Sequence, residues 1–388
     1  MKRWKRALAL GAAGLMTAAA PLAAFAASPE FSRTEEEWAQ LRDDVLEYEE
    51  LAGLIHEYNA TVQQNAIDYA YFRNEYGETN TEWADKYREL ASDLRDAIDY
   101  PDIDDSSYGT QMAQAITNEA SADTYEESAD DALEDIYVKY LEYSQEEAQL
   151  VQSAQTLMIS YYLNQLQQQI DTKTQELSQL TYDYTVKQRD VGMATDIEVL
   201  SAFESLRSTE QALIDDQTAI DSGRKSLLVL CGWDANADAE IRSIPEVDEE
   251  RITQMDPTTD TETAIANNYT LLSNTRQYEN ARSNDKKETL AVSMADNERN
   301  IKASVSSSYQ SVLSSKIAYD LAVTQAALEA QNLTIAQTKA ANGQLDVLSL
   351  QTQQNTTETA ALNVEVARLN LFQAIQSYEW AINGLADA

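Results

Sequence analysis

Apolar side chains recur every seven residues over long parts of this chain. One series is Leu163, Ile170, Leu177 and Tyr184, and a second runs over residues 199–227 at the same spacing. A spacing of seven keeps one apolar seam facing a neighbouring helix and favours left-handed supercoiling. The pattern therefore predicts long helices that pack side by side.

The last predicted helix carries two apolar stripes instead of one. Their members are Leu362, Val366 and Leu369 on one stripe, and Val364, Leu371, Ile375, Tyr378 and Ile382 on the other. Two residues along a helix correspond to a rotation of about 200°, so the stripes lie on nearly opposite sides. A helix that is apolar on opposite sides needs neighbours on both, which favours a wall of adjacent helices over a two-stranded rod.

Helix breakers are scarce, and their positions support the same prediction. The chain has no glycine between Gly109 and Gly192, nor between Gly232 and Gly343, and no proline between Pro101 and Pro245 or after Pro257. The stretches without either residue are rich in Ala, Leu, Gln and Glu. Uninterrupted stretches of this composition favour helices of roughly 60–80 residues, which are on the order of 100 Å long.

A helix–turn–helix sequence occurs twice. Near residue 190 the chain reads QRDVGMATDI, and near residue 340 it reads KAANGQLDVL. A glycine that follows a helix reverses the chain at low cost, because it adopts the left-handed conformation easily. Thr195 or Asp196 in the first copy, and Asp346 in the second, are then expected to cap the next helix. The turn residues are Val191, Gly192, Thr195 and Asp196 in the first copy, and Asn342, Gly343 and Asp346 in the second.

The duplication extends back from these turns. The segment Leu54–Asn59 resembles Ala264–Tyr269, position by position. We therefore predict two helical repeat units, over residues 27–232 and 262–388. The first unit is longer by about 59 residues.

We place the extra residues of the first unit near 74–136, where an acidic stretch predicts two short helices around a loop. Residues 233–261 contain two prolines and many aspartates, and we expect an irregular linker there. Near the N-terminus, Thr34 and Glu37 form a capping box, which predicts the start of a helix.

Residues 1–26 have the pattern of an export signal. Four basic residues precede an apolar stretch from Ala7 to Pro21, and Ala24-Phe25-Ala26 matches the small-x-small cleavage pattern. Cleavage is the favoured interpretation, and a retained anchor is the alternative. No later run of 18 apolar residues occurs, so the mature chain is predicted to lack a membrane-spanning helix. The expected location is extracytoplasmic, in the cell envelope or at the surface.

The chain is strongly acidic. It has 28 Lys and Arg, four of them in the signal, against 66 Asp and Glu, so residues 27–388 carry a net charge of −42. This balance excludes a general nucleic-acid or anionic-membrane binder, because phosphate contacts need basic faces. The single cysteine, Cys231, follows an apolar run and is expected to be a buried small hydrophobe.

We find no pattern that predicts catalysis, a metal site or a cofactor. His56 is the only histidine, so zinc ligation and Ser-His chemistry lack partners. No phosphate loop or nucleophile elbow occurs. The acidic run Asp234–Glu240 imitates the start of a calcium loop, but it lacks the glycine and the final glutamate of such loops. A solvated linker explains it better, and we predict that the protein is not an enzyme.

Taken together, the order and spacing of these features resemble the TolC-type outer-membrane efflux protein family, over roughly residues 45–385. The residues that carry the resemblance are Val191, Gly192, Thr195, Asp196, Gly343, Asp346 and Val347. The resemblance implies an all-α fold of duplicated long antiparallel hairpins that form a helical wall. It also implies a homotrimer whose turns meet a membrane-fusion adaptor, which works with a transporter in the inner or cytoplasmic membrane.

One departure from the family is evident. Its members usually interrupt each unit with strands that complete a membrane β-barrel, with alternating apolar residues. Glu279–Ser307 shows no such alternation, and the insert of the first unit is too acidic to face lipid. We therefore expect a member without barrel strands.

The sequence favours an exported component of an efflux or secretion system, a channel or scaffold that docks an adaptor. If a tunnel forms, its interior is expected to be electronegative. The alternative is a secreted structural or adhesive coiled-coil protein with no role in transport.

Overall fold

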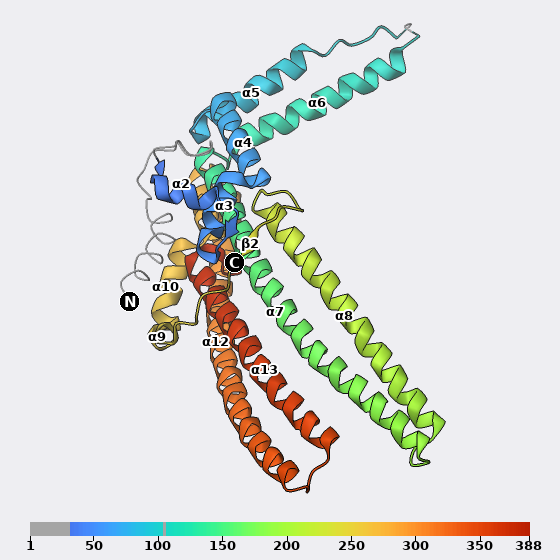
Figure 1. Ribbon diagram of the computed structural model, residues 1–388. Coiled ribbons are helices and arrows are strands. Elements are labelled where there is room, and N and C mark those ends of the chain that lie inside the picture. The colour runs from blue at the N-terminus through green and yellow to red at the C-terminus, as the bar shows by residue number, and fades with distance from the viewer. Residues whose placement is uncertain (1–31, 104–105) are drawn as a thin grey trace.

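The computed structural model describes residues 32–103 and 106–388, and the export signal predicted for residues 1–26 lies outside them. The described chain is almost entirely helical (Figure 1). Its elements, in chain order, are α2 (Glu35–Leu41), β1 (Val45–Leu46), η2 (Tyr48–Glu50), α3 (Leu51–Tyr58), α4 (Ala60–Tyr76), α5 (Asn80–Asp96), α6 (Tyr108–Asp130), α7 (Ile136–Asp190), α8 (Asp196–Leu230), β2 (Glu240–Ile241), α9 (Glu249–Gln254), α10 (Pro257–Asn267), α11 (Tyr269–Asn280), α12 (Asn284–Ala341), α13 (Val347–Trp380) and η3 (Ala381–Leu385). Within the described ranges, no helix is both long enough and apolar enough to span a bilayer.

Two antiparallel hairpins of long helices form the body of the molecule (Figure 1). Helix α7 has 55 residues and turns into α8, and α12 has 58 residues and turns into α13. Helix α7 packs on both α8 and α13, and α13 packs on α12. The order across the wall is therefore α8, α7, α13, α12. The predicted all-α fold of duplicated hairpins is confirmed, and Glu279–Ser307 is almost wholly helical, in α11 and α12.

The two apolar stripes of α13 pack into two different cores, as its pattern predicts. Leu369 lies in a core with buried residues of α3, α7 and α8. Leu371, Ile375 and Tyr378 lie in a second core with buried residues of α10 and α12. Helix α13 therefore joins the two hairpins into one wall, because each of its sides buries apolar surface against a different neighbour.

Each repeat unit closes on an asparagine at a break between two helices. Asn59 separates α3 from α4, and its side-chain N–H donates to the Leu230 carbonyl at 2.8 Å. Asn268 separates α10 from α11, and its side-chain N–H donates to the Ala386 carbonyl at 2.9 Å. In both cases the side-chain oxygen accepts from the first turn of the helix that follows. One buried amide thus caps a helix and holds the end of the unit.

These contacts correct the alignment of the two units. The sequence comparison pairs Asn59 with Tyr269, but Asn59 and Asn268 have the same structural role. The alignment is therefore wrong by one residue. The apolar residues tolerate either register, whereas the two amides occupy one defined position in each helix break.

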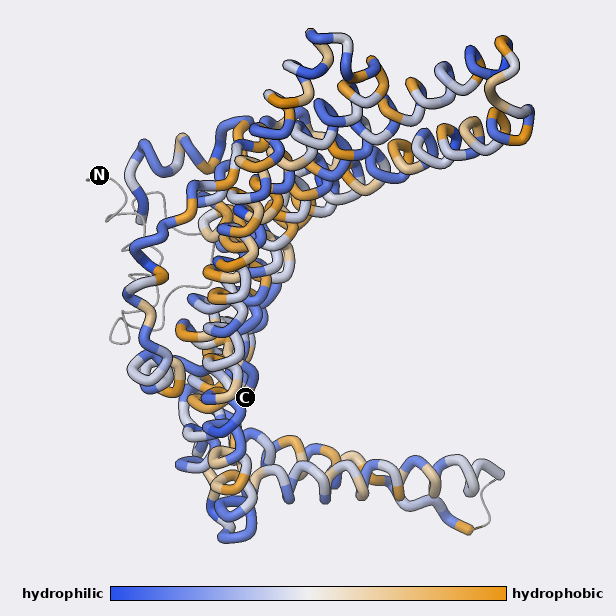
Figure 2. The backbone as a smooth tube through the Cα atoms, turned by 90° about the horizontal axis from the view of Figure 1, so that it is seen from below, coloured by the Kyte–Doolittle hydropathy of each residue, from blue (hydrophilic) through white to orange (hydrophobic). Residues whose placement is uncertain are grey.

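The extra residues of the first unit form a helical hairpin, α5 and α6, which we call the arm. It projects from the rest of the molecule, on the side of the wall where α8 lies (Figures 1 and 2). Alanines at intervals of seven line its seam, and their small side chains let the two helices approach closely. The buried alanines are Ala84, Ala91, Ala115, Ala122 and Ala129. At the base of the arm, Tyr87 stacks on Tyr125.

The linker between the units is less irregular than expected. Strand β2 pairs in parallel with β1, and α9 follows it. Helix α10 then begins at Pro257, ahead of the predicted start of the second unit at residue 262. Asp256 caps this helix and Pro257 occupies its first turn, a combination that favours a helix start.

The capping box of Thr34 and Glu37 is present and starts α2. The helix ends at Leu41. Val45 follows in β1, where it pairs with the linker, a backbone partner far away in the sequence.

Glu50 gives this region a testable pH dependence. Burial and repulsion from Glu47 raise the pKa of Glu50 to about 7. Between its ordinary value and about pH 7, the folded chain holds a proton that the unfolded chain has lost. Stability therefore falls as the pH rises through this window. We expect Glu50→Gln to stabilise the protein by about 1 kcal/mol at about pH 8, a figure reduced for solvent screening, and to have little effect at about pH 4.

Thermal unfolding at the two pH values measures this effect, with Glu49→Gln, a change at the exposed neighbour, as the control. A pH-independent response of Glu50→Gln would contradict the assignment.

Candidate functional site

The two turns that the sequence singled out lie at the free ends of the two hairpins, and we call them tip 1 and tip 2 (Figure 1). In tip 1, Gly192 has a φ of +75°, and the N–H of Met193 donates to the Gln188 carbonyl at 2.7 Å. In tip 2, Gly343 has a φ of +69°, and the N–H of Gln344 reaches back in the same way. Both are Schellman motifs, so the predicted reversal at glycine is confirmed.

The next helices start with the predicted caps. The Thr195 hydroxyl accepts from the Glu198 N–H, and the Glu198 carboxylate accepts from the Thr195 N–H at 2.6 Å. The hydrogen bonds that the Thr195 N–H and the Thr195 hydroxyl donate to the Glu198 carboxylate lower the pKa of Glu198. Asp346 caps α13 by accepting from the hydroxyl and the N–H of Ser349, which lowers the pKa of Asp346. Thr195, and not Asp196, is therefore the cap of tip 1.

Both tips expose apolar side chains. Val191, Met193, Ile197 and Val347 are 70–79% exposed. Capping explains the polar residues of the turns, but it gives no reason for apolar residues at the most exposed points of the hairpins. Three of these side chains, Val191, Met193 and Ile197, lie at tip 1, and Val347 lies at tip 2.

A groove runs between α7 and α8 beside tip 1. It has a volume of about 370 Å³, and small or hydroxyl-bearing side chains form most of its lining. The lining residues are Thr181, Thr185, Gln188, Ala194, Glu198, Ser201, Ala202 and Ser205. Small residues at a helix surface allow another backbone to approach closely, so the groove extends the exposed surface of tip 1.

The seven turn residues form two separate groups, because the tips lie apart at the ends of different hairpins (Figure 1). Val191, Gly192, Thr195 and Asp196 belong to tip 1, and Asn342, Gly343 and Asp346 belong to tip 2. Higher up the wall, Lys173 of α7 forms an ion pair with Glu358 of α13 at 3.0 Å.

The two outer helices of the wall carry exposed apolar stripes. On α8 the stripe consists of Leu200, Phe203 and Ile214, which are 42–60% exposed. On α12 it consists of Ile317, Leu321, Leu328 and Ile335, which are 48–68% exposed and recur at intervals of four, seven and seven. Residues at these spacings share one face of a helix. The edges of the wall thus have the same apolar character as its interior seams.

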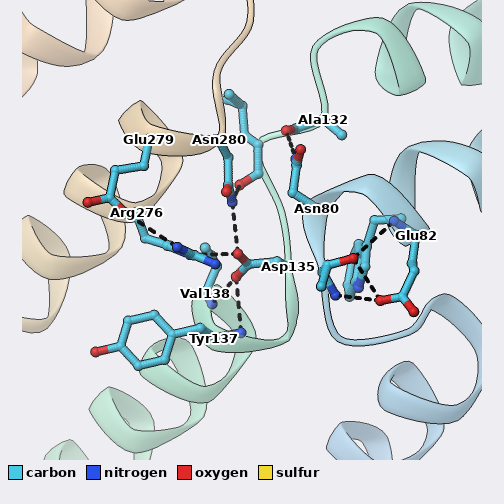
Figure 3. Close-up of polar contacts among 12 residues, drawn as sticks. Asn80, Glu82, Ala132, Asp135, Tyr137, Val138, Arg276, Glu279 and Asn280 are labelled. Carbon is cyan, nitrogen blue, oxygen red and sulfur yellow. Dashed lines mark hydrogen bonds and ion pairs between the residues drawn. The ribbon is translucent and has the colours of Figure 1, made fainter.

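A polar clamp joins the two units at the end of the wall opposite the tips (Figure 3). Asp135 is fully buried, and its Oδ1 accepts from the N–H groups of Tyr137 and Val138. Its Oδ2 accepts from Arg276 Nε at 2.6 Å and from Asn280 Nδ2 at 3.0 Å. One carboxylate thus caps α7 and binds α11. Sequence reasoning missed Asp135, because it is one of 66 acidic residues and its partners on α11 lie in the other repeat unit.

The singular residues of the chain have structural partners. The His56 ring shares a hydrogen bond with Glu147 across α3 and α7 at 2.8 Å, and this bond raises the pKa of His56. Cys231 is fully buried, as predicted, and burial raises the pKa of its thiol to about 12. Such a thiol is protonated at neutral pH and is a poor nucleophile.

Comparison with known proteins gives a result at the level of structure alone. No protein-family model and no curated protein matches the sequence. The outer-membrane channel OprN aligns with a TM-score of 0.52 and 14% identity, over 95% of this chain and 98% of that chain. A membrane protein from Pseudomonas aeruginosa aligns with a TM-score of 0.57 and 11% identity, over 89% and 93%.

The outer membrane protein VceC from Vibrio cholerae aligns with a TM-score of 0.52 and 11% identity, over 89% of this chain and 96% of that chain. These alignments span nearly the whole of both partners. The TolC-like fold that the sequence predicted is therefore confirmed.

Proposed function

We propose that this protein is an exported component of an envelope efflux or secretion system, in which several copies close into a helical channel or scaffold. The wall has a free helix on each edge, and each edge carries an exposed apolar stripe. The shared fold with outer-membrane channels supports this function. The two exposed apolar edges are the observation that carries the proposal.

In the proposed assembly, α8 of one copy packs on α12 of the next. This contact is head-to-tail, and a contact of this kind closes a ring when the rotation between copies divides a full turn. The resemblance to TolC-type proteins suggests three copies. The carboxylate excess would make the interior electronegative and disfavour small anions. Conduction would be passive, with energy supplied by a transporter in the inner or cytoplasmic membrane.

Lysine substitutions in the α12 stripe test the proposed contact between copies. We expect Leu321→Lys with Leu328→Lys to abolish self-association, because each charge would have to be desolvated in the new seam. Sedimentation velocity over a range of concentrations measures the effect. Val323→Lys is the matched control, since Val323 is exposed on another face of α12. If the double variant assembles like the wild type, or the wild type remains a monomer, the proposed assembly through the α8–α12 contact is wrong. The structural coiled-coil alternative would then gain support.

The tips are the proposed docking points for a membrane-fusion adaptor. We expect Ile197→Asp with Val347→Asp to weaken adaptor binding at least about tenfold, since both side chains are exposed and apolar. The probe is the purified adaptor of the same cell, with binding followed by interferometry. Ile116→Asp, at an exposed position of the arm, is the control. Unchanged adaptor binding by the tip variant would exclude the tips as the docking site.

A further inference from the structure

The arm takes no part in the proposed α8–α12 seam, and it projects away from the body of the molecule (Figure 1). It leaves the body beside α4 and projects on the side of the wall where α8 lies, away from α9 and α10 (Figure 1). In the proposed ring, that side faces the neighbouring copy. Helix α6 has 23 residues and is therefore about 35 Å long. Packed helices lie about 8–10 Å apart, so the arm is long enough to cross several helices of a neighbour.

The surface that the neighbour offers at this level is the start of its α12. In the wall, α12 is the helix on the opposite edge, and its N-terminal part lies at the end away from the tips (Figure 1). Val292, Arg299 and Lys302 are exposed there, at intervals of seven and three, and therefore share one face. Val292 is among the most exposed apolar side chains of α12.

The two surfaces differ in charge. Helices α5 and α6 contain ten acidic and three basic residues, and the three bases already pair with carboxylates of α4, α5 or α6. The start of α12, residues 284–302, contains four basic and four acidic residues and is therefore neutral, in a chain that is otherwise strongly acidic. Arg299 pairs with Asp296 of the same helix. Within the described residues, Lys302 forms no ion pair. The acidic arm is therefore repelled less by this neutral stretch than by most other surfaces of the protein, and the unpaired Lys302 can attract its carboxylates.

The difference between the two repeat units favours the same contact. The second unit has no arm, since α11 and α12 are joined by Ala281–Ser283 alone. Around a ring, armed and armless units alternate, so each arm meets an armless neighbour. Helix α4 adds apolar surface beside the arm, with Ile67 and Tyr71 exposed one turn apart.

We propose that the arm of one copy clasps the N-terminal part of α12 in the next copy, through acidic residues of α5 and α6 and basic residues of α12. The clasp lies at the end of the ring opposite the tips and adds to the apolar α8–α12 seam. It rests on the proposed assembly, and it gives the insert of the first unit a function as an interlock between copies.

A shortened arm and a charge reversal test the clasp. In the first variant a short Gly-Ser turn replaces residues 92–121, which retains the stacked Tyr87 and Tyr125 at the base. The second variant is Arg299→Glu with Lys302→Glu. A matched control, Lys187→Glu with Lys339→Glu, makes the same change in net charge near the tips. Circular dichroism verifies that each purified variant is folded, and sedimentation velocity gives its dissociation constant for self-association.

We expect the shortened arm and the reversal on α12 each to raise the dissociation constant at least about tenfold, with no change in the control. The two changes combined should raise the dissociation constant no further than either change alone, because both remove the same contact. A higher salt concentration should reduce the difference in dissociation constant between the wild type and the variants. If the wild type assembles and the variant with the shortened arm assembles equally well, the clasp is wrong, and the proposed α8–α12 contact between copies is unaffected. If Leu321→Lys with Leu328→Lys also leaves assembly unchanged, the proposed α8–α12 contact between copies is wrong.

Discussion

Gly232→Ala should destabilise the protein by about 2–5 kcal/mol, although it adds a single methyl group. Gly232 ends α8 with a φ of +82°, and a Cβ there would lie 2.3 Å from the backbone carbonyl oxygen of Tyr58. The left-handed conformation costs a non-glycine residue about 1–2 kcal/mol. The clash adds about 1–3 kcal/mol more, because the neighbouring atom belongs to the backbone at the break between α3 and α4 and has little freedom to move.

Gly192→Ala is the matched control for this substitution. Gly192 has nearly the same φ, +75°, but no atom lies within 4 Å of the position that a Cβ would occupy. We expect the control to cost only the conformational part of the free energy, about 1–2 kcal/mol. Urea unfolding followed by circular dichroism measures both variants. Equal losses for the two would show that the close approach of Gly232 to Tyr58 is unimportant.

The second unit offers an independent repetition of this comparison. Gly384 has a φ of +112°, and a Cβ there would lie 2.8 Å from the Asn267 carbonyl oxygen, whereas Gly343 has open space around it. The unit-closing glycines are therefore held by two requirements, conformation and close approach. The tip glycines are held by conformation alone.

The wall could be predicted from the sequence because its cause is repeated along the chain. A seam such as that of α8 places Leu206, Ile220 and Leu227 on one buried face, and each turn of the helix adds the same information. The tips were predictable for a similar reason, since a Schellman turn depends on a glycine and its immediate neighbours. Thr195 and Asp346 are local caps and need no partner elsewhere in the fold.

The contacts that close the fold could not be predicted in this way, because each depends on a single residue and a distant partner. The roles of Asn59 and Asn268 depend on hydrogen bonds to Leu230 and Ala386, at the ends of helices far away in the sequence. Val45 lies in a strand whose partner, Glu240, is far away in the sequence. Whether the tips and edges dock partners stays a prediction, since exposure of apolar residues shows a surface and not its occupant.

The clamp at Asp135 is the second place where a large effect is expected, and the size of the effect depends on which partner is removed. Arg276→Ala should destabilise the protein by about 3–5 kcal/mol, because it leaves the fully buried carboxylate of Asp135 without its counter-charge. Asp135→Asn should cost less, about 1–2 kcal/mol. The amide oxygen can still cap α7, and Arg276, which is partly exposed, can turn towards water.

The double variant, Asp135→Asn with Arg276→Ala, decides between a buried charge and simple loss of contacts. If the buried charge dominates, the double variant should be more stable than Arg276→Ala alone, because the stranded carboxylate is gone. If loss of contacts dominates, the two costs should add. Urea unfolding of the two single variants and the double variant gives the coupling directly. Additive losses would mean that the clamp in Figure 3 stabilises the fold through its hydrogen bonds to α7 and α11 and not through the charge of Asp135.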